Sequence, residues 1–279
     1  MGDIVWLASY PKSGNTWIRA LLHNLFWNRS DPINVNRMQG DLTQSDGMLT
    51  WYRMLDKRPC QEWSADDVAR MRPKVDELIA QTSPGSIVCK THNALLVSRG
   101  YPTINMEVTS GAVYIVRNPL DVTPSFADFL GVDLDTAINH MGTVDLETQS
   151  DPAYNNVQLL LGSWSQHVKS WTGRPNRQLH VVRYEDLHDD PVRILRKLTR
   201  FLGLKPSRQR LLKAIKNSSF KVMQSQEKRL GFKERSPFQR RFFRRGVANG
   251  WREELTDKQV ERICSDHHEQ MKRFDYLPR

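Results

Sequence analysis

The sequence predicts a single α/β domain in which a central, mostly parallel sheet is flanked by helices. Apolar runs of strand length alternate along the chain with longer segments in which apolar residues recur at helical spacing. The first run, residues 4–8, ends in a tight loop that opens directly into a helix containing Ile18, Leu21 and Leu25. A chain of 279 residues can bury a substantial core, so we expect one domain over residues 1–279.

The loop after the first strand has the composition of an anion site. Pro11 fixes φ at the entry to the turn, and Gly14 has no Cβ to keep an anion from the backbone. The N–H groups and the positive dipole end of the new helix would then face a phosphate. The alternative is an ordinary turn with a solvated lysine, and the Walker A pattern is absent. The residues assigned to the site are Lys12, Ser13, Gly14, Asn15, Thr16 and Trp17.

The side chains of this loop are expected to have different roles. Ser13, Asn15 and Thr16 are expected to cap the new helix. Lys12 would add a full positive charge beside the phosphate oxygens, and Trp17 offers a flat apolar face. We therefore expect a phosphate here, with a base or ring beside it.

The remaining elements follow in order. Residues 28–64 are polar and irregular, so we expect a long loop with short helices that folds over the sheet edge. Residues 131–156 are likewise expected to form a loop with one short helix. Strands are predicted at 86–90, 111–117 and 179–183, and helices at 65–80, 118–129, 157–171, 192–202, 207–215 and 257–274.

The net charge of +10 indicates an anionic partner, and it is concentrated in one window. Between Lys221 and Arg252 there are ten basic residues and only two acidic ones, Glu227 and Glu234. Such a block fits a solvated surface, a nucleic-acid patch or a lid that closes on a small polyanion. The charge pattern by itself leaves these three open.

The chain lacks the marks of export or membrane insertion. It has neither 18 consecutive apolar residues nor a signal-peptide pattern, so we expect no membrane span. Cys60, Cys89 and Cys264 are odd in number and far apart, which favours a reducing cytoplasm over a disulfide framework. No cluster of His and Cys has ligand spacing, so no metal is expected.

Motifs at expected strand ends and helix starts follow one another along the chain. They are YPKSGNTW (10–17), KTH (90–92), VRNPLDVTPSFADF (116–129), YEDL with a later proline (184–191), SSFKVM (218–223) and FRRG (243–246). Together, over residues 4 to about 251, they resemble the cytosolic-type, PAPS-dependent sulfotransferases. The resemblance implies a P-loop-like fold of the sulfotransferase and nucleotide-kinase kind. It also implies 3′-phosphoadenosine 5′-phosphosulfate (PAPS) as donor and adenosine 3′,5′-bisphosphate (PAP) as product.

The resemblance assigns a nucleotide contact to each motif. The 12–16 loop would hold the 5′-phosphosulfate, Trp17 and Phe220 would sandwich adenine, and Tyr184 would reach the nucleotide. Arginine suits the 3′-phosphate because its planar fork pairs phosphate bidentately. The residues implied at the 3′-phosphate are Arg117, Ser125, Arg244, Arg245 and Gly246, and those implied around the base also include Ser218, Ser219 and Met223.

The resemblance also implies the catalytic set. His92 would be the general base, because a histidine is largely neutral near pH 7. Lys12 would stabilise charge on the leaving phosphate, and Lys90 would lie against the sulfuryl oxygens. Two departures stand out. Asn249-Gly250-Trp251 replaces the usual Gly-Asp-Trp, and Leu255-Thr256-Asp257 matches the dimerisation signature poorly, which leaves the oligomeric state open.

The implied reaction moves a sulfuryl group from PAPS to a hydroxyl of a small, partly apolar or aromatic acceptor, without a metal. A nitrogen or sugar acceptor stays open. The irregular segments 28–64, 126–156 and 224–243 would form the acceptor pocket and lid. Two other classes remain: a magnesium-dependent P-loop kinase of nucleotides or small molecules, and a nucleic-acid-binding protein that uses the basic block 221–252.

Overall fold

The computed structural model describes residues 2–40 and 42–278, and their contacts gather in two compact units. Unit 1 comprises residues 2–10, 43–114 and 142–181, and unit 2 comprises 11–40, 42, 115–141 and 182–278. The prediction of one domain over 1–279, with lid loops at 28–64, 126–156 and 224–243, stays a prediction. Its positions 1, 41 and 279 lie outside the described residues.

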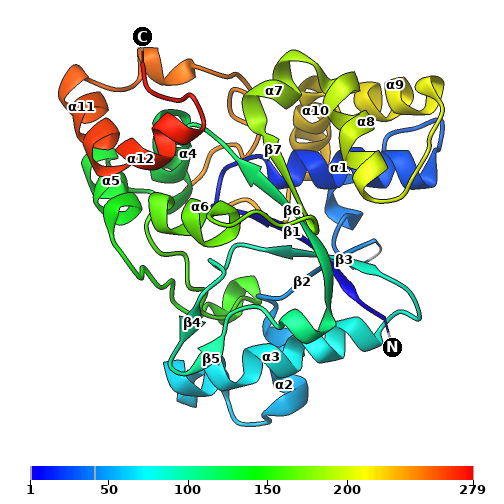
Figure 1. Cartoon of the computed structure of the whole chain (residues 1–279), viewed down its shortest axis with the longest axis vertical. Coiled ribbons are helices and arrows are strands. Elements are labelled where there is room, and N and C mark those ends of the chain that lie inside the picture. Colours follow the sequence, from blue (N-terminus) through cyan, green and yellow to red (C-terminus); the bar gives the residue numbers. More distant parts are fainter. Residues whose placement is uncertain (1, 41, 279) are drawn as a thin grey trace. The chain divides into compact units, whose positions relative to one another are not determined.

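The main sheet has five strands in the order β2-β3-β1-β6-β7 (Figure 1). β1 pairs with β3 in parallel, with Ala8 opposite Thr91, and β3 pairs with β2 in parallel. The predicted α/β class with a mostly parallel sheet is confirmed. The strands are β1 (Ile4–Ser9), β2 (Thr43–Ser45), β3 (Ile87–Thr91), β6 (Thr109–Val116) and β7 (Leu179–Arg183); β4 (Val97–Ser98) and β5 (Tyr101–Pro102) form a separate antiparallel pair.

The four predicted strands hold to within two residues at each end, whereas β2, β4 and β5 were not expected. β1 reads as a continuous apolar run because its residues are buried at almost every position, as in a parallel sheet covered on both faces. β2 has only three residues, Thr43–Ser45, and no apolar alternation that could be recognised in sequence. It lies inside the segment predicted as a loop.

The helices of unit 1 include a well-capped one, α3 (Ala65–Gln81), close to the predicted bounds. The Ser64 side chain accepts from the backbone N–H of Asp67 while the Asp67 side chain accepts from that of Ser64, which satisfies two free donors. Val75 and Ile79 face the core, and α3 packs against α2 (Figure 1). The other helical segments of this unit are α2 (Leu49–Leu55), α6 (Trp164–Thr172) and the short 3₁₀ turns η2 (Cys60–Glu62), η3 (Met106–Val108) and η4 (Pro152–Tyr154).

The helix predicted at 157–171 is wrong in its first half, because only α6 (Trp164–Thr172) forms. Gly162 has φ of +63°, which a right-handed helix cannot contain. Ser163 caps the helix instead, its side chain accepting from the N–H of Gln166. The residues from 157 to 162 are not helical, and Leu160 donates its N–H to Asn93 Oδ1.

Unit 2 consists mainly of helices, and α1 (Asn15–Trp27) packs against α9 (Arg208–Asn217) (Figure 1). α4 (Pro119–Leu130) begins with a proline, which is favourable at the first helical position, and the Asn118 side chain caps it. The other helical segments are η1 (Val35–Arg37), α4 (Pro119–Leu130), α5 (Leu134–Gly142), α7 (Tyr184–Asp189), α8 (Pro191–Phe201), α10 (Phe220–Leu230), η5 (Gly250–Glu253), α11 (Asp257–Asp266) and α12 (His268–Arg273).

The final helix, predicted as one element over 257–274, is divided in two at His267, whose φ of −121° is not helical. Ile263 and Met271 are buried as predicted, and Val260 is only partly buried. The periodicity therefore identified the inward face but not the break.

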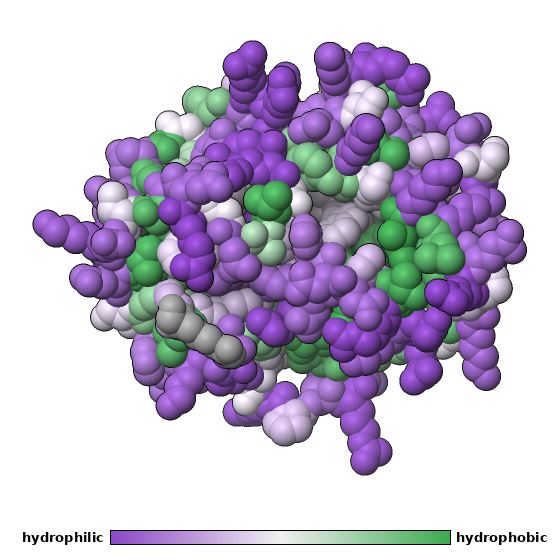
Figure 2. All heavy atoms as spheres, turned by 90° about the horizontal axis from the view of Figure 1, so that it is seen from above, coloured by the Kyte–Doolittle hydropathy of each residue, from purple (hydrophilic) through white to green (hydrophobic). Residues whose placement is uncertain are grey.

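Figure 2 shows one face of the molecule, which is mostly hydrophilic with separate apolar patches. Within the described chain, no helix has both the length and the apolar character needed to cross a bilayer.

Candidate active site

The loop between β1 and α1 has two residues in the left-handed backbone region, Lys12 (φ +65°) and Gly14 (φ +103°). A Cβ at Gly14 would lie 2.7 Å from the Tyr184 ring, so glycine is required by both conformation and space. The predicted capping by Ser13, Asn15 and Thr16 is wrong. Gly14 itself is the N-cap and, among the described residues, it gives no side-chain cap hydrogen bond to α1; the start of a helix is a favourable place for an anion.

Ser13 is the residue of this loop that most directly indicates a ligand. Only 1% of its surface is exposed, and its hydroxyl has no hydrogen-bond partner among the described residues. A buried hydroxyl without a partner costs about 1–3 kcal/mol. A phosphate oxygen at the start of α1 would satisfy it, so the residues present fit a phosphorylated cofactor.

Lys12 lies between two aromatic rings of unit 2. Its ammonium is 4.1 Å from the ring centroid of Phe242 and 4.9 Å from that of Phe129. Cation–π contacts of this kind are worth about 0.5–2 kcal/mol. They hold the ammonium of Lys12 against the two rings, and its contact with a phosphate stays a prediction.

Arg117, which follows β6, connects the loop to the segment that contains Val247. Its Nη1 donates to the carbonyl oxygen of Lys12 at 3.0 Å, and its Nη2 donates to that of Val247 at 3.2 Å. The guanidinium also lies 4.3 Å over the Tyr184 ring. The structure thus brings three of the predicted residues together. Ser125 lies on α4, half-buried, and its contact with the same phosphate stays a prediction.

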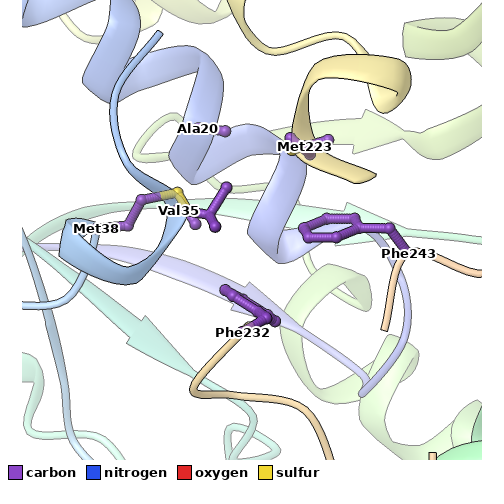
Figure 3. Packing of buried hydrophobic residues seen from close by; sticks show 6 residues of the cluster. All are labelled: Ala20, Val35, Met38, Met223, Phe232 and Phe243. Carbon is purple, nitrogen blue, oxygen red and sulfur yellow. The ribbon is translucent and has the colours of Figure 1, made fainter. Parts of the chain in front are cut away.

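The predicted adenine site borders a buried apolar cluster of unit 2. Trp17, Phe220 and Phe242 are partly buried against it, and Trp17 also meets the Tyr184 ring edge-on at 5.6 Å. Gly246 (φ +65°) is needed because a Cβ there would lie 2.1 Å from the Phe220 ring. The cluster consists of Ala20, Val35, Met38, Met223, Phe232 and Phe243 (Figure 3).

Ser218 and Ser219, which were predicted to lie near the nucleotide, both have structural roles in unit 2. Ser218, the C-cap of α9, is buried, and its hydroxyl accepts from Asn24 Nδ2 at 2.9 Å, which connects the end of α9 to α1. Ser219 is the N-cap of α10. Their contact with a nucleotide stays a prediction.

The predicted arginine clamp is engaged by two acidic residues that sequence reasoning missed. Arg244 forms a bidentate pair with Glu254, at 2.6 and 2.9 Å. Arg245 lies 2.6 Å from Glu253 and 3.1 Å from Glu254. Burial raises the pKa of Glu254, but the hydrogen bonds and charges of the two arginines outweigh it and lower the pKa overall.

The segment that carries this clamp is held by buried carboxylates. Asp121 accepts from the backbone N–H of Asn249 at 2.7 Å and of Trp251 at 3.0 Å, which stabilises the departure from the family pattern. Glu227 accepts from the N–H groups of Phe242 and Phe243 at 2.7 and 3.0 Å.

Glu234 forms a bidentate pair with Arg19 of α1, at 2.7 and 2.8 Å. Glu227 and Glu234 are the two acidic residues of the basic window. Their isolation among positive charges was a signal that could have identified them as anchors of this segment.

In unit 1, His92 follows β3 and is fixed to the end of β1. Its Nδ1 lies 2.7 Å from the carbonyl oxygen of Ser9 and 3.3 Å from the Ser9 hydroxyl. A carbonyl only accepts, so Nδ1 carries the proton in the neutral ring and the lone pair is on Nε2. This is the tautomer that a general base acting through Nε2 requires.

The residues on either side of His92 share one buried carboxylate. Asp46 Oδ2 accepts from Thr91 Oγ1 at 2.6 Å and from Asn93 Nδ2 at 2.9 Å. Burial raises the pKa of Asp46, and these two hydrogen bonds lower it in part. Lys90 lies on β3, half-buried. No group of three or more His, Cys, Asp or Glu among residues 2–40 and 42–278 could hold a metal ion.

A mostly parallel sheet whose first strand is followed by a tight loop and a helix is common in nucleotide-binding α/β proteins. The comparison with protein families narrows this class. Residues 3–275 match the sulfotransferase domain, so the chain belongs to the sulfotransferase family. Members of this family are PAPS-dependent enzymes.

Named relatives extend over nearly the whole chain. Human sulfotransferase 1C2 is 26% identical over 276 residues, covering 94% of this chain and 80% of that protein. Sulfotransferase 1E1 of Cavia porcellus is 28% identical over 279 residues, covering 97% and 83%.

Solved structures share the fold at lower identity. Mouse sulfotransferase SULT7A1, complexed with PAP, has a TM-score of 0.61 at 20% identity, over 99% of this chain and 90% of that one. Retinol dehydratase, in complex with androsterone and the inactive cofactor PAP, has a TM-score of 0.63 at 17% identity, over 96% and 80%. These likenesses show that the chain has the sulfotransferase fold.

Proposed function

We propose that the protein transfers the sulfuryl group of PAPS to a hydroxyl of a small, partly apolar or aromatic acceptor, with His92 as general base. The observation that carries the proposal is the buried hydroxyl of Ser13 at the mouth of α1, beside the charge of Lys12. The PAP complexes of mouse SULT7A1 and retinol dehydratase support the donor. Androsterone in the latter supports an apolar, hydroxyl-bearing acceptor.

The residues of unit 2 would hold the donor. Ser13 and the first N–H groups of α1 would bind the 5′-phosphosulfate, with Lys12 supplying positive charge. Trp17 and Phe220 would enclose adenine, and stacking of this kind is worth about 1–3 kcal/mol per contact. Arg117, Ser125, Arg244 and Arg245 would bind the 3′-phosphate.

His92 would move the proton. Because Nδ1 donates to Ser9, the Nε2 lone pair accepts the proton of the acceptor hydroxyl as its oxygen forms the new O–S bond. The bond between sulfur and the 5′-phosphate oxygen breaks, and Lys12 stabilises the charge left on that oxygen. Lys90 would stabilise the sulfuryl oxygens. PAPS supplies the transferable group, and the protein supplies position, charge and the base.

Location and acceptor pocket are part of the proposal. The cytoplasm is proposed because Cys60, Cys89 and Cys264 are free and the motifs resemble those of the cytosolic-type sulfotransferases. Segments 28–64, 126–156 and 224–243 are proposed to shape the acceptor pocket and lid.

Thermal unfolding with nucleotides tests the donor. A saturating concentration of PAP should raise the unfolding midpoint by roughly 5 °C or more, because binding stabilises only the folded state. Adenosine 5′-monophosphate, which lacks the 3′-phosphate, is the matched control and should raise it much less. An equal or larger rise with ATP and magnesium would contradict the proposal and favour a kinase.

A further inference from the structure

His167, on α6, is a fully buried histidine that contacts the ends of three neighbouring strands of unit 1. Its Nε2 lies 3.1 Å from the backbone carbonyl oxygen of His92, after β3. Its Nδ1 lies 2.8 Å from the hydroxyl of Tyr114, on β6. Its ring also meets edge-on the ring of Tyr10, which comes directly after β1, with 5.6 Å between the ring centroids.

These partners fix the protons of His167. The carbonyl oxygen of His92 only accepts, so Nε2 carries the proton, and the Nδ1 lone pair accepts from the Tyr114 hydroxyl. Burial lowers the pKa of His167 to about 3. Burial also raises the pKa of Tyr114 well above its usual range, so the phenol keeps its proton. The chain of donors therefore runs in one direction, from Tyr114 through His167 to the main chain of His92.

His92 is thus held at two points. Its imidazole donates to the Ser9 carbonyl, and its own carbonyl accepts from His167. Ser9 follows the last β1 residue paired with β3, and Tyr10, which comes next, packs on His167. The same helix holds the next residue as well, because Trp171 Nε1 donates to the carbonyl of Asn93 at 3.0 Å. α6 therefore fixes the backbone on which the proposed base is carried.

We propose that His167, with Tyr114 behind it, is a positioning residue for sulfuryl transfer: it holds the His92 backbone so that the imidazole keeps its bond to Ser9 and its lone pair on Nε2. The proposal rests on the proposed role of His92. A displacement of a catalytic group by about 1 Å can reduce a rate by roughly 10²-fold. Loss of the His167 contact should therefore lower kcat without changing donor binding.

The test compares His167→Phe, which keeps an aromatic ring but removes the donor, with His167→Gln, whose amide can donate to the same carbonyl. His167→Phe should lower kcat about 10-fold or more, while the KM for acceptor and the affinity for PAP change by less than about 2-fold. His167→Gln should recover most of the rate. Nitrogen NMR of His92 should show the Nδ1–H tautomer in the wild type and a mixture in His167→Phe.

Two further variants keep the test decisive. Tyr114→Phe removes only the hydroxyl and should lower kcat about 3-fold, even if His167→Phe does not fold. Thr109→Val is the matched control, because it removes a hydroxyl of the same unit that bonds to Trp6 and to the Asn105 carbonyl. It should lower stability and leave kcat unchanged.

The outcomes separate the two proposals. Unchanged kcat in both His167→Phe and Tyr114→Phe, with an inactive His92→Ala, would overturn the role of His167 alone. Equal loss of kcat in His167→Gln and His167→Phe would overturn it too. If His92→Ala itself keeps full activity, the general-base role in the proposed function fails instead.

Discussion

The proposed base and the proposed phosphate clamp are held in opposite ways. His92 is fixed by hydrogen bonds to main-chain and buried groups, with His167 and Asp46 almost fully shielded from solvent. Arg244 and Arg245 are held by Glu253 and Glu254 through ion pairs at the surface. Buried hydrogen bonds define one geometry, whereas exposed ion pairs are weak and exchange partners readily.

This difference matches what each group must do in the proposed reaction. A base has to lie at one position relative to the acceptor, so a rigid setting serves it. Arg244 and Arg245 have to release Glu253 and Glu254 before they can bind a phosphate. Exposed ion pairs, which break easily, suit that exchange. The following predictions test this contrast, from the largest expected effect to the smallest.

Replacing the base should have the largest effect. His92→Ala should lower kcat by about 10²–10⁴-fold, the range for a well-placed general base. PAP affinity, measured by calorimetry, should stay within about 2-fold, because the proposed donor site consists of other residues. If the variant retains wild-type turnover, a group other than His92 must accept the proton of the acceptor hydroxyl.

Removing the charge at the mouth of α1 should affect donor binding. Lys12→Met keeps the apolar stem between Phe129 and Phe242 but loses the ammonium. Dissociation constants for PAP should rise about 10- to 100-fold, as expected for a hydrogen bond to a charged group. Lys221→Met, on the outer surface of α10, is the control with the same charge change. Equal affinity of the Lys12 variant and the wild type would count against the site.

The buried histidine behind the base predicts a dependence of stability on pH. His167 has a pKa of about 3 in the folded state and 6.5 when unfolded, so the unfolded chain binds more protons below pH 6.5. This contribution is complete above pH 6.5 and is lost as the pH falls, by up to about 1.4 kcal/mol per pH unit. Urea unfolding from pH 7 to 5 should therefore show a steeper decline for wild type than for His167→Gln. Parallel curves would show that His167 is not kept neutral by burial.

A glycine-to-alanine substitution beside Phe220 should distinguish an effect on adenine binding from the strain that any alanine causes at a positive φ. Gly246→Ala introduces a Cβ 2.1 Å from the Phe220 ring, whereas a Cβ at Gly203, which has a similar positive φ, would meet no non-neighbouring atom of the described chain within 4 Å. Both should lose about 1–2 kcal/mol of stability to the backbone conformation. Only Gly246→Ala should weaken PAP binding, about 5- to 10-fold. Equal PAP affinity of the two variants would show that Phe220 does not contact the nucleotide.

The adjustable clamp gives the smallest effect. Glu254→Gln removes a carboxylate that competes with phosphate for Arg244 and Arg245, and should tighten PAP binding roughly 2- to 5-fold at low salt. Glu261→Gln, exposed on α11, is the control. Weaker PAP binding in Glu254→Gln would mean that the carboxylate orients the arginines rather than competing with phosphate.

Much of the fold and part of the site could be predicted because their signals are local. The bounds of β7 and the start of α3 follow from apolar runs and a serine cap within a few residues. The helix predicted before Trp164 failed because Gly162 takes a left-handed conformation that apolar periodicity cannot reveal. The carboxylates that bind the clamp were missed because no motif pairs them with arginines.

The sequence by itself determined the class of the fold, the position of the loop from Lys12 to Thr16 that is proposed to bind phosphate, and the position of the histidine after β3. Each of these depends on residues that are adjacent in the chain, so short-range patterns suffice. Only the tertiary structure decided which nitrogen of His92 carries the proton, what supports its backbone and what occupies the arginines. Those facts depend on contacts between residues such as His92 and His167, which are far apart in sequence and meet only when the strands and α6 have folded together.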